Sequence, residues 1–204
     1  MKKFIIQIAG FLALSLSVSG ADMNPALVGF LKEYLSIKYR DTSFDRFIYV
    51  AAKKQKLYLI EGEEIIASYN ISTAKNGIGQ NSGSFKTPAG LHQIAEKVGE
   101  DLPINSIIKQ KVATGELARP IEIAESTNQD FITSRVMHLK GMEPQVNSGG
   151  KVDSYERGIF IHGTHEEGLI GQAASKGCVR MTNSDVIDLF QRVEVGTFVV
   201  ILNN

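Results

Sequence analysis

The sequence predicts a mainly β fold with a few short helices. Short β-branched and apolar runs recur between residues 46 and 202, turn-forming residues separate them, and helical periodicity is confined to a few short segments. The 204 residues are 43% hydrophobic and 22% charged, which is ordinary globular composition and enough chain to bury a core. No internal repeat or Ser/Pro-rich linker divides residues 46–204, so we expect one domain there.

The first 21 residues have the pattern of a secretory signal peptide. Lys2 and Lys3 precede an apolar run over residues 4–18, and small residues follow, so cleavage is expected after Ala21. A membrane anchor is the alternative, but the run is shorter than the ~20 apolar residues of a spanning helix. We therefore expect no stable membrane anchor after cleavage. The basic start with a short apolar centre is typical of bacterial export, which predicts the periplasm or cell exterior.

Residues 22–45 are expected to form a helical N-terminal segment. Apolar residues recur at near-helical spacing from Leu27 to Ile37, and Asn24-Pro25 supplies a cap and a first helical residue. We expect this helix to pack on the main domain, and a partner-binding helix is the alternative.

Several strands are predicted from the alternation of apolar runs and turns. Residues 75–83 are rich in Gly and Asn and are expected to be loop, and Thr87-Pro88-Ala89-Gly90 is a turn. An apolar run at 158–161 leads into His162. The expected strands are 46–52, 56–60, 64–72, 91–95, 132–139 and 197–202.

Residues 100–129 do not follow this alternation of apolar runs and turns. Ile104, Ile107, Ile108 and Val112 have helical spacing, which predicts an insertion carrying a short helix. The insertion is either a lid over the functional site or a surface excursion.

A late helix is predicted by Val186, Leu189, Phe190 and Val193, which share one face. Thr182 is its expected N-cap, and Gly196 is expected to end it.

Charge and cysteine content limit the partners and the covalent chemistry that the chain can have. Lysine and arginine total 22, as do aspartate and glutamate, so no basic excess indicates nucleic acid as a partner. The only cysteine, Cys178, excludes an intrachain disulfide. Because exported proteins usually pair their cysteines, a lone one is either buried and inert or retained for chemistry.

His162 lies sixteen residues before Cys178, and the intervening loop can bring an imidazole beside the thiol. A thiol needs such a base, or positive charge, to become a nucleophile at neutral pH. Lys176 and Arg180 flank the cysteine and are expected to favour its ionised form. Gly177 permits close backbone approach, so that neighbouring amides can stabilise an oxyanion.

These residues resemble the signature of the L,D-transpeptidase catalytic-domain family of the YkuD type. The signature stands here as His162-Gly163-Thr164 followed by Ser175-Lys176-Gly177-Cys178-Val179-Arg180. Two weaker features agree: the Thr-Pro-Ala-Gly turn at 87–90 and the closing strand at 195–200. The resemblance spans roughly residues 46–202, with 100–129 outside it.

The resemblance implies a β-sandwich-like fold in which Cys178 and His162 face each other across a substrate channel. It implies acyl transfer on peptidoglycan stem tetrapeptides, with Cys178 as nucleophile, His162 as base, a thioester intermediate and release of D-alanine. Such an enzyme serves peptidoglycan biosynthesis, cell-wall organisation and cell shape. The acceptor is another stem peptide, an envelope protein or a free D-amino acid. No metal or organic cofactor is implied.

One departure from the signature is Lys176, which replaces the second histidine and puts substrate preference in question more than catalysis. Arg180 is expected to support the site or a substrate carboxylate, with a structural ion pair as the alternative. Ser175 either hydrogen-bonds in the pocket or turns the chain. Gly163 and Gly177 are expected to act through backbone shape.

The other histidines receive weaker interpretations. His165 is expected to be a solvated loop residue, His92 a strand residue outside the signature, and His138 faces either the pocket or the core. A zinc site of His162, His165 and Cys178 has suitable ligand types but lacks a second cysteine or a helical histidine pair. Two alternative functions remain at this point: an L,D-carboxypeptidase that uses water as acceptor, and a non-catalytic cell-wall-binding module.

Overall fold

The computed structural model describes residues 25–40, 42–127 and 129–204. The expected signal peptide, residues 1–21, lies outside them. No helix in the described part of the chain is long and apolar enough to cross a membrane.

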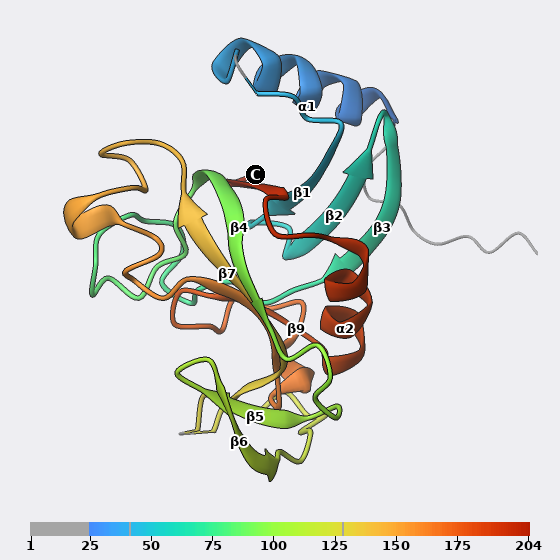
Figure 1. Ribbon diagram of the computed structural model, residues 1–204, viewed down its shortest axis with the longest axis vertical. Helices are drawn as coiled ribbons and strands as arrows, with labels where there is room; N and C mark the ends of the chain where they lie inside the picture. Colours follow the sequence, from blue (N-terminus) through green and yellow to red (C-terminus); the bar gives the residue numbers. More distant parts are fainter. Residues whose placement is uncertain (1–24, 41, 128) are drawn as a thin grey trace, which may run out of the picture.

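Within the described residues, ten strands form one mixed sheet in which β7 is the branch point (Figure 1). Along the main path the order is β3-β2-β1-β10-β4-β7-β5-β6, and β8 pairs with the other edge of β7 and carries β9. Two helices, α1 (Pro25–Lys38) and α2 (Asn183–Arg192), accompany the sheet. The mainly β prediction is confirmed. The strands are β1 (Arg46–Ala51), β2 (Lys56–Glu61), β3 (Glu64–Asn70), β4 (Gly90–Val98), β5 (Ser106–Lys109), β6 (Val112–Leu117), β7 (Ile132–Gly141), β8 (Phe160–Thr164), β9 (Val179–Met181) and β10 (Phe198–Leu202).

Alternate residues of β1 face two different apolar cores, as the period of two along a strand requires. Ile48 and Val50 join a cluster with residues of β2, β7, β8, β9 and α2. Strands from both ends of the sheet order therefore contribute to this first core. Phe47 and Tyr49 join a second cluster, which α1 covers. The sandwich-like arrangement therefore follows from the sheet turning at β7.

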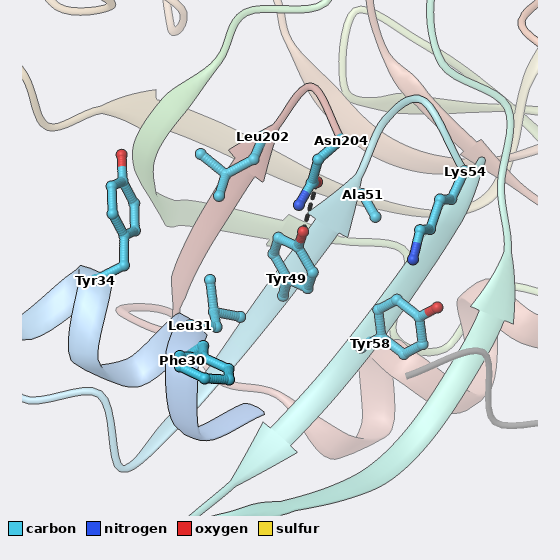
Figure 2. A pocket seen from close by; sticks show the side chains of 9 residues that line it. All are labelled: Phe30, Leu31, Tyr34, Tyr49, Ala51, Lys54, Tyr58, Leu202 and Asn204. Atoms are coloured by element: carbon cyan, nitrogen blue, oxygen red, sulfur yellow. Dashed lines mark hydrogen bonds between the residues drawn. The ribbon is translucent and has the colours of Figure 1, made fainter. Parts of the chain in front are cut away.

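Helix α1 packs on the main domain by one side only (Figure 2). Val28 and Leu35 are buried in the second cluster, which confirms that the helix packs on the domain. Phe30 and Tyr34 are exposed and line a cavity of about 270 Å³ together with Tyr58 and other residues of the sheet. Figure 2 shows this hollow between α1 and the β1–β2 hairpin. The helix is thus held by a short row of buried side chains.

The prediction of a helix in residues 100–129 is wrong, because this segment contains the hairpin β5–β6. Gln110 and Lys111 form its two-residue turn, with φ of 49° and 64°, the left-handed geometry that suits tight hairpins. Ile107 and Ile108 are buried where β5 pairs with β7. β-Branched residues fit such a strand well, and over a short run their spacing does not distinguish strand from helix.

Smaller differences concern the C-terminal third. His162 lies inside β8, whereas the sequence places it after an apolar strand, and the short strand β9 was not expected. The Thr182 cap is confirmed, since its hydroxyl accepts the Asp185 amide at 3.2 Å. Helix α2 ends at Arg192, so Gly196 lies in the turn beyond it, with a φ of 97°.

Replacing Leu35 by alanine is expected to lower the free energy of unfolding by about 2–5 kcal/mol, because a fully buried side chain is removed. Ile37→Ala in the same helix is the matched control. Its side chain is 64% exposed, so the expected change is below about 0.5 kcal/mol. Denaturant unfolding measures both. Equal and small effects would contradict the packing of α1 on the sheet.

Candidate active site

The site is built on the parallel pair of strands β8 and β9. Their register places Ile161 beside Val179 and His162 beside Arg180. Ile161 and Val179 point into the first core, so His162 and Arg180 lie on the opposite face. Cys178 directly precedes β9, two residues before Arg180, and its sulfur accepts the Phe160 amide at 3.4 Å. The two sequence-predicted catalytic residues thus lie on one face, His162 within β8 and Cys178 at the entry to the adjacent strand β9.

The Cys178 thiol is held by backbone in the resting protein. Its Sγ donates to the carbonyl oxygen of Gly158 at 3.4 Å while it accepts from Phe160. Burial raises the pKa of this thiol to about 11, and the charge of Asp130 acts in the same direction. The thiol is therefore neutral near pH 7.

His162 is buried and also neutral. Its Nδ1 lies 2.7 Å from the carbonyl oxygen of Gly163, an arrangement in which Nδ1 carries the proton and Nε2 keeps its lone pair. Burial lowers the pKa of His162, and the positive charge of Arg180 lowers it further. The imidazole is thus available as a base at neutral pH.

Arg180 favours the ionised thiol, as expected, but two carboxylates offset its charge. It is buried and donates to Glu166 at 2.8 Å and to Asp130. Arg180 does lower the pKa of Cys178, but burial outweighs it. The geometry matches the alternative of a structural ion pair, which anchors β9 to the loop after β8.

Lys176, the departure from the signature, is exposed, and its Nζ lies 3.8 Å from Asp130. Its charge therefore faces a carboxylate. Asp130 directly follows the segment 100–129 and forms ion pairs with both Lys176 and Arg180, the basic residues beside Cys178. It also borders a cavity of about 470 Å³ that the β5–β6 turn and Phe131 line. The insertion thus reaches the rim of the site.

The insertion also packs on the loop that follows His162. The Ile121 amide donates to the His165 carbonyl at 2.7 Å, and the Gly168 amide donates to the Ile121 carbonyl at 2.8 Å. A Cβ on Gly168 would lie 2.1 Å from the Ile123 carbonyl oxygen, so glycine permits this close approach.

Ser175, Gly177 and Gly163 act through local geometry. The Ser175 hydroxyl donates to the Cys178 carbonyl at 2.6 Å and accepts the Gly177 amide at 3.2 Å, so it ties the turn before the cysteine. Gly177 has a φ of 137°, which few other residues adopt. A Cβ on Gly163 would lie 2.6 Å from the Thr133 carbonyl oxygen, which makes glycine necessary where β8 passes β7.

The remaining histidines lie in separate surroundings. The expectation of a solvated His165 is wrong: it is buried, its ring is tilted against that of Phe131 with 4.8 Å between the ring centroids, and its Nε2 lies 3.2 Å from the Thr127 hydroxyl. His92 is a buried strand residue, as expected. His138 stacks on Tyr155 at 3.9 Å and borders Phe160. The described residues contain no group of three or more side chains able to hold a metal ion.

Sequence reasoning missed Asp130 and Glu166, the carboxylates that hold Arg180, and Arg157, whose positive charge lowers the pKa of Cys178. Each lies outside the signature and in no recognisable pattern. The one available signal was Arg180 itself, because an arginine on a buried strand needs carboxylate partners.

Comparisons with known proteins identify the same family that the sequence signature resembles. The family model described as L,D-transpeptidase catalytic domain (YkuD) matches residues 45–201. "Probable L,D-transpeptidase YcfS" of Escherichia coli (strain K12) is 25% identical over 197 residues, which are 95% of this chain and 55% of that protein. "Putative L,D-transpeptidase YkuD" of Bacillus subtilis (strain 168) is 45% identical over 62 residues, which are 28% of this chain and 38% of that protein. The chain thus spans about half or less of these two curated relatives.

A solved structure has a similar fold. The L,D-transpeptidase (residues 123–326) from Xylanimonas cellulosilytica DSM 15894 superposes with a TM-score of 0.50 at 16% identity, covering 84% of this chain and 68% of that one. At this identity the likeness concerns the fold alone.

Gly163→Ala is expected to lower the free energy of unfolding by about 1–3 kcal/mol and to reduce any Cys178-dependent activity. The new methyl group meets backbone of β7, so β8 has to move and takes His162 with it. Gly29→Ala in α1 is the control, because a Cβ there meets nothing within 4 Å. Thermal unfolding compares the two variants. A Gly163→Ala protein as stable as the Gly29→Ala protein would contradict the close packing of β8 on β7.

Proposed function

We propose that this chain, which belongs to the L,D-transpeptidase catalytic domain family, is a cysteine-dependent transpeptidase that acts on peptidoglycan stem tetrapeptides. The observation that carries the proposal is the placement of His162 within β8 and of Cys178 at the entry to the parallel neighbour β9, on the same face. A neutral thiol and a neutral imidazole with a free Nε2 are the reactants that general-base activation of a nucleophile requires.

The first half-reaction forms a thioester. Rotation of the Cys178 side chain away from the Gly158 carbonyl brings Sγ towards Nε2 of His162, which takes the thiol proton. The thiolate attacks the carbonyl carbon at the L-centre of the diamino acid in stem position three. The bond from that carbon to the nitrogen of the terminal D-alanine then breaks. His162 returns its proton to this nitrogen, so D-alanine leaves as a neutral amine and His162 is again neutral.

The second half-reaction transfers the acyl group. The amine of an acceptor attacks the thioester carbon, the sulfur leaves, and the proton released by the amine returns through His162 to the thiolate. The acceptor is the side-chain amine of another stem, which gives a cross-link. An envelope protein or a free D-amino acid offers the same amine chemistry.

An oxyanion forms in both steps and needs nearby donors. The Gly177 amide already donates to the Ser175 hydroxyl. The Cys178 amide has no acceptor among the described residues, which supports its role as an oxyanion donor. Ser175 contributes by fixing the turn that aims this amide.

The proposed location is the periplasm, reached through removal of residues 1–21. Its support is the sequence pattern of a basic start, a short apolar run and small residues at the cleavage point.

Incubation of the mature protein with purified disaccharide-tetrapeptides, followed by mass spectrometry, tests the function. Cross-linked dimers that lack one D-alanine are expected with the wild type and not with Cys178→Ala. His162→Gln keeps the thiol and loses the base, so its rate should fall by roughly 10²–10⁴-fold. Far-UV circular dichroism verifies that both variants are folded.

The products separate the alternatives. Tripeptides alone would replace the proposal with an L,D-carboxypeptidase that uses water as acceptor. Absence of any Cys178-dependent product would contradict an enzymatic role and favour a wall-binding module.

A further inference from the structure

Arg157 lies just before β8, and its guanidinium reaches across to a loop far away in sequence. Nη1 donates to the carbonyl oxygens of Gln80 at 2.7 Å and Gly79 at 3.3 Å, and Nη2 donates to that of Lys86 at 2.6 Å. The fork of one arginine thus ties both ends of residues 79–86, a loop without regular secondary structure.

This loop and Arg157 border the cysteine from two sides. The Lys86 carbonyl oxygen lies 3.5 Å from the position of a Cβ on Gly177. The residue after Arg157, Gly158, carries the carbonyl that accepts the Cys178 thiol at 3.4 Å. A shift of Arg157 would therefore move backbone on both sides of the sulfur.

The charge of Arg157 is also distinctive. Arg180 is offset by Glu166 and Asp130, and Lys176 faces Asp130. Among the described residues, Arg157 has only carbonyl oxygens as acceptors, so no carboxylate neutralises it. Its positive charge lowers the pKa of Cys178, in opposition to burial and to Asp130.

We propose that Arg157 is the positioning residue for the Cys178 nucleophile: it holds the 79–86 loop against the cysteine turn and places beside that turn a positive charge that no carboxylate among the described residues neutralises. The charged and titratable groups around that sulfur are His162 on β8, Arg180 on β9, Asp130 before β7, and Arg157. When the thiol proton moves to His162, the sulfur gains a negative charge. Arg157 is the cation that stabilises it without a competing carboxylate. The proposal rests on the proposed function only for the use of that anion in acyl transfer.

The test is the pH dependence of Cys178 alkylation by iodoacetamide. In this reaction the thiolate sulfur displaces iodide from the reagent, so no stem peptide is needed. Arg157→Gln removes the charge and should lower the alkylation rate at a given pH by roughly three- to tenfold, moving the profile to higher pH. Arg157→Lys keeps the charge and loses the fork, so the midpoint of its pH profile should stay with wild type, while its limiting rate at high pH should change because the 79–86 loop is no longer held against the cysteine turn. Arg192→Gln, which removes an exposed arginine on α2, is the control and should leave the profile unchanged.

A second measurement needs no variant. Wild-type protein should react faster with anionic iodoacetate, relative to neutral iodoacetamide, than free cysteine does, because the cation attracts the anionic reagent. Coincident profiles for wild type and Arg157→Gln, equal shifts for Arg157→Gln and Arg157→Lys, or an iodoacetate preference no greater than that of free cysteine would each overturn the proposal. Since alkylation is independent of substrate, failure of the stem-peptide assay with the expected alkylation profiles would count against the proposed function and not against Arg157.

Discussion

The parallel pairing of β8 with β9 is the constraint on which the site depends. Three register pairs place His162 beside Arg180 and bring Cys178, the residue before β9, next to the start of β8, while Ile161 and Val179 fill the first core. β8 is in turn paired with β7, where Gly163 allows close contact. The large sheet, α2 and the core beneath it act as a rigid base for this short ladder. A strand therefore positions His162, while Cys178 lies where the turn around Ser175 enters β9.

Burial determines the protonation state of the resting site. It raises the pKa of the Cys178 thiol and lowers that of His162, so both groups are neutral and the protein carries no preformed ion pair between them. The positive charge of Arg180 does not change this, because Asp130 and Glu166 offset it. A neutral thiol also resists oxidation better than a thiolate. In the proposed mechanism, activation of Cys178 therefore requires proton transfer to His162 at the moment of attack.

The features predictable from sequence were those that local chemistry determines. The strands β1 to β3 follow from alternating apolar residues and turns, both helices from their periodicity, and the helix α2 start from its Thr182 cap. Cys178 and His162 were found through a compact motif. The hairpin β5–β6 was missed because a short isoleucine run fits strand and helix equally well. His165 was misjudged for another reason: its burial depends on Phe131 and Thr127, which tertiary packing alone brings near it. The carboxylate partners of Arg180 are likewise brought near it only by tertiary packing.

The central claim is that the resting site holds a neutral cysteine–histidine pair. The ¹⁵N chemical shifts of the His162 ring nitrogens, followed by NMR in histidine-labelled protein between about pH 4 and pH 9, measure it directly. A neutral ring near pH 7, with Nδ1 protonated and Nε2 unprotonated, is the predicted result, and the ring should gain charge only below the usual histidine range. A doubly protonated ring near pH 7 that becomes neutral in Cys178→Ala would reveal a thiolate–imidazolium pair and contradict the account.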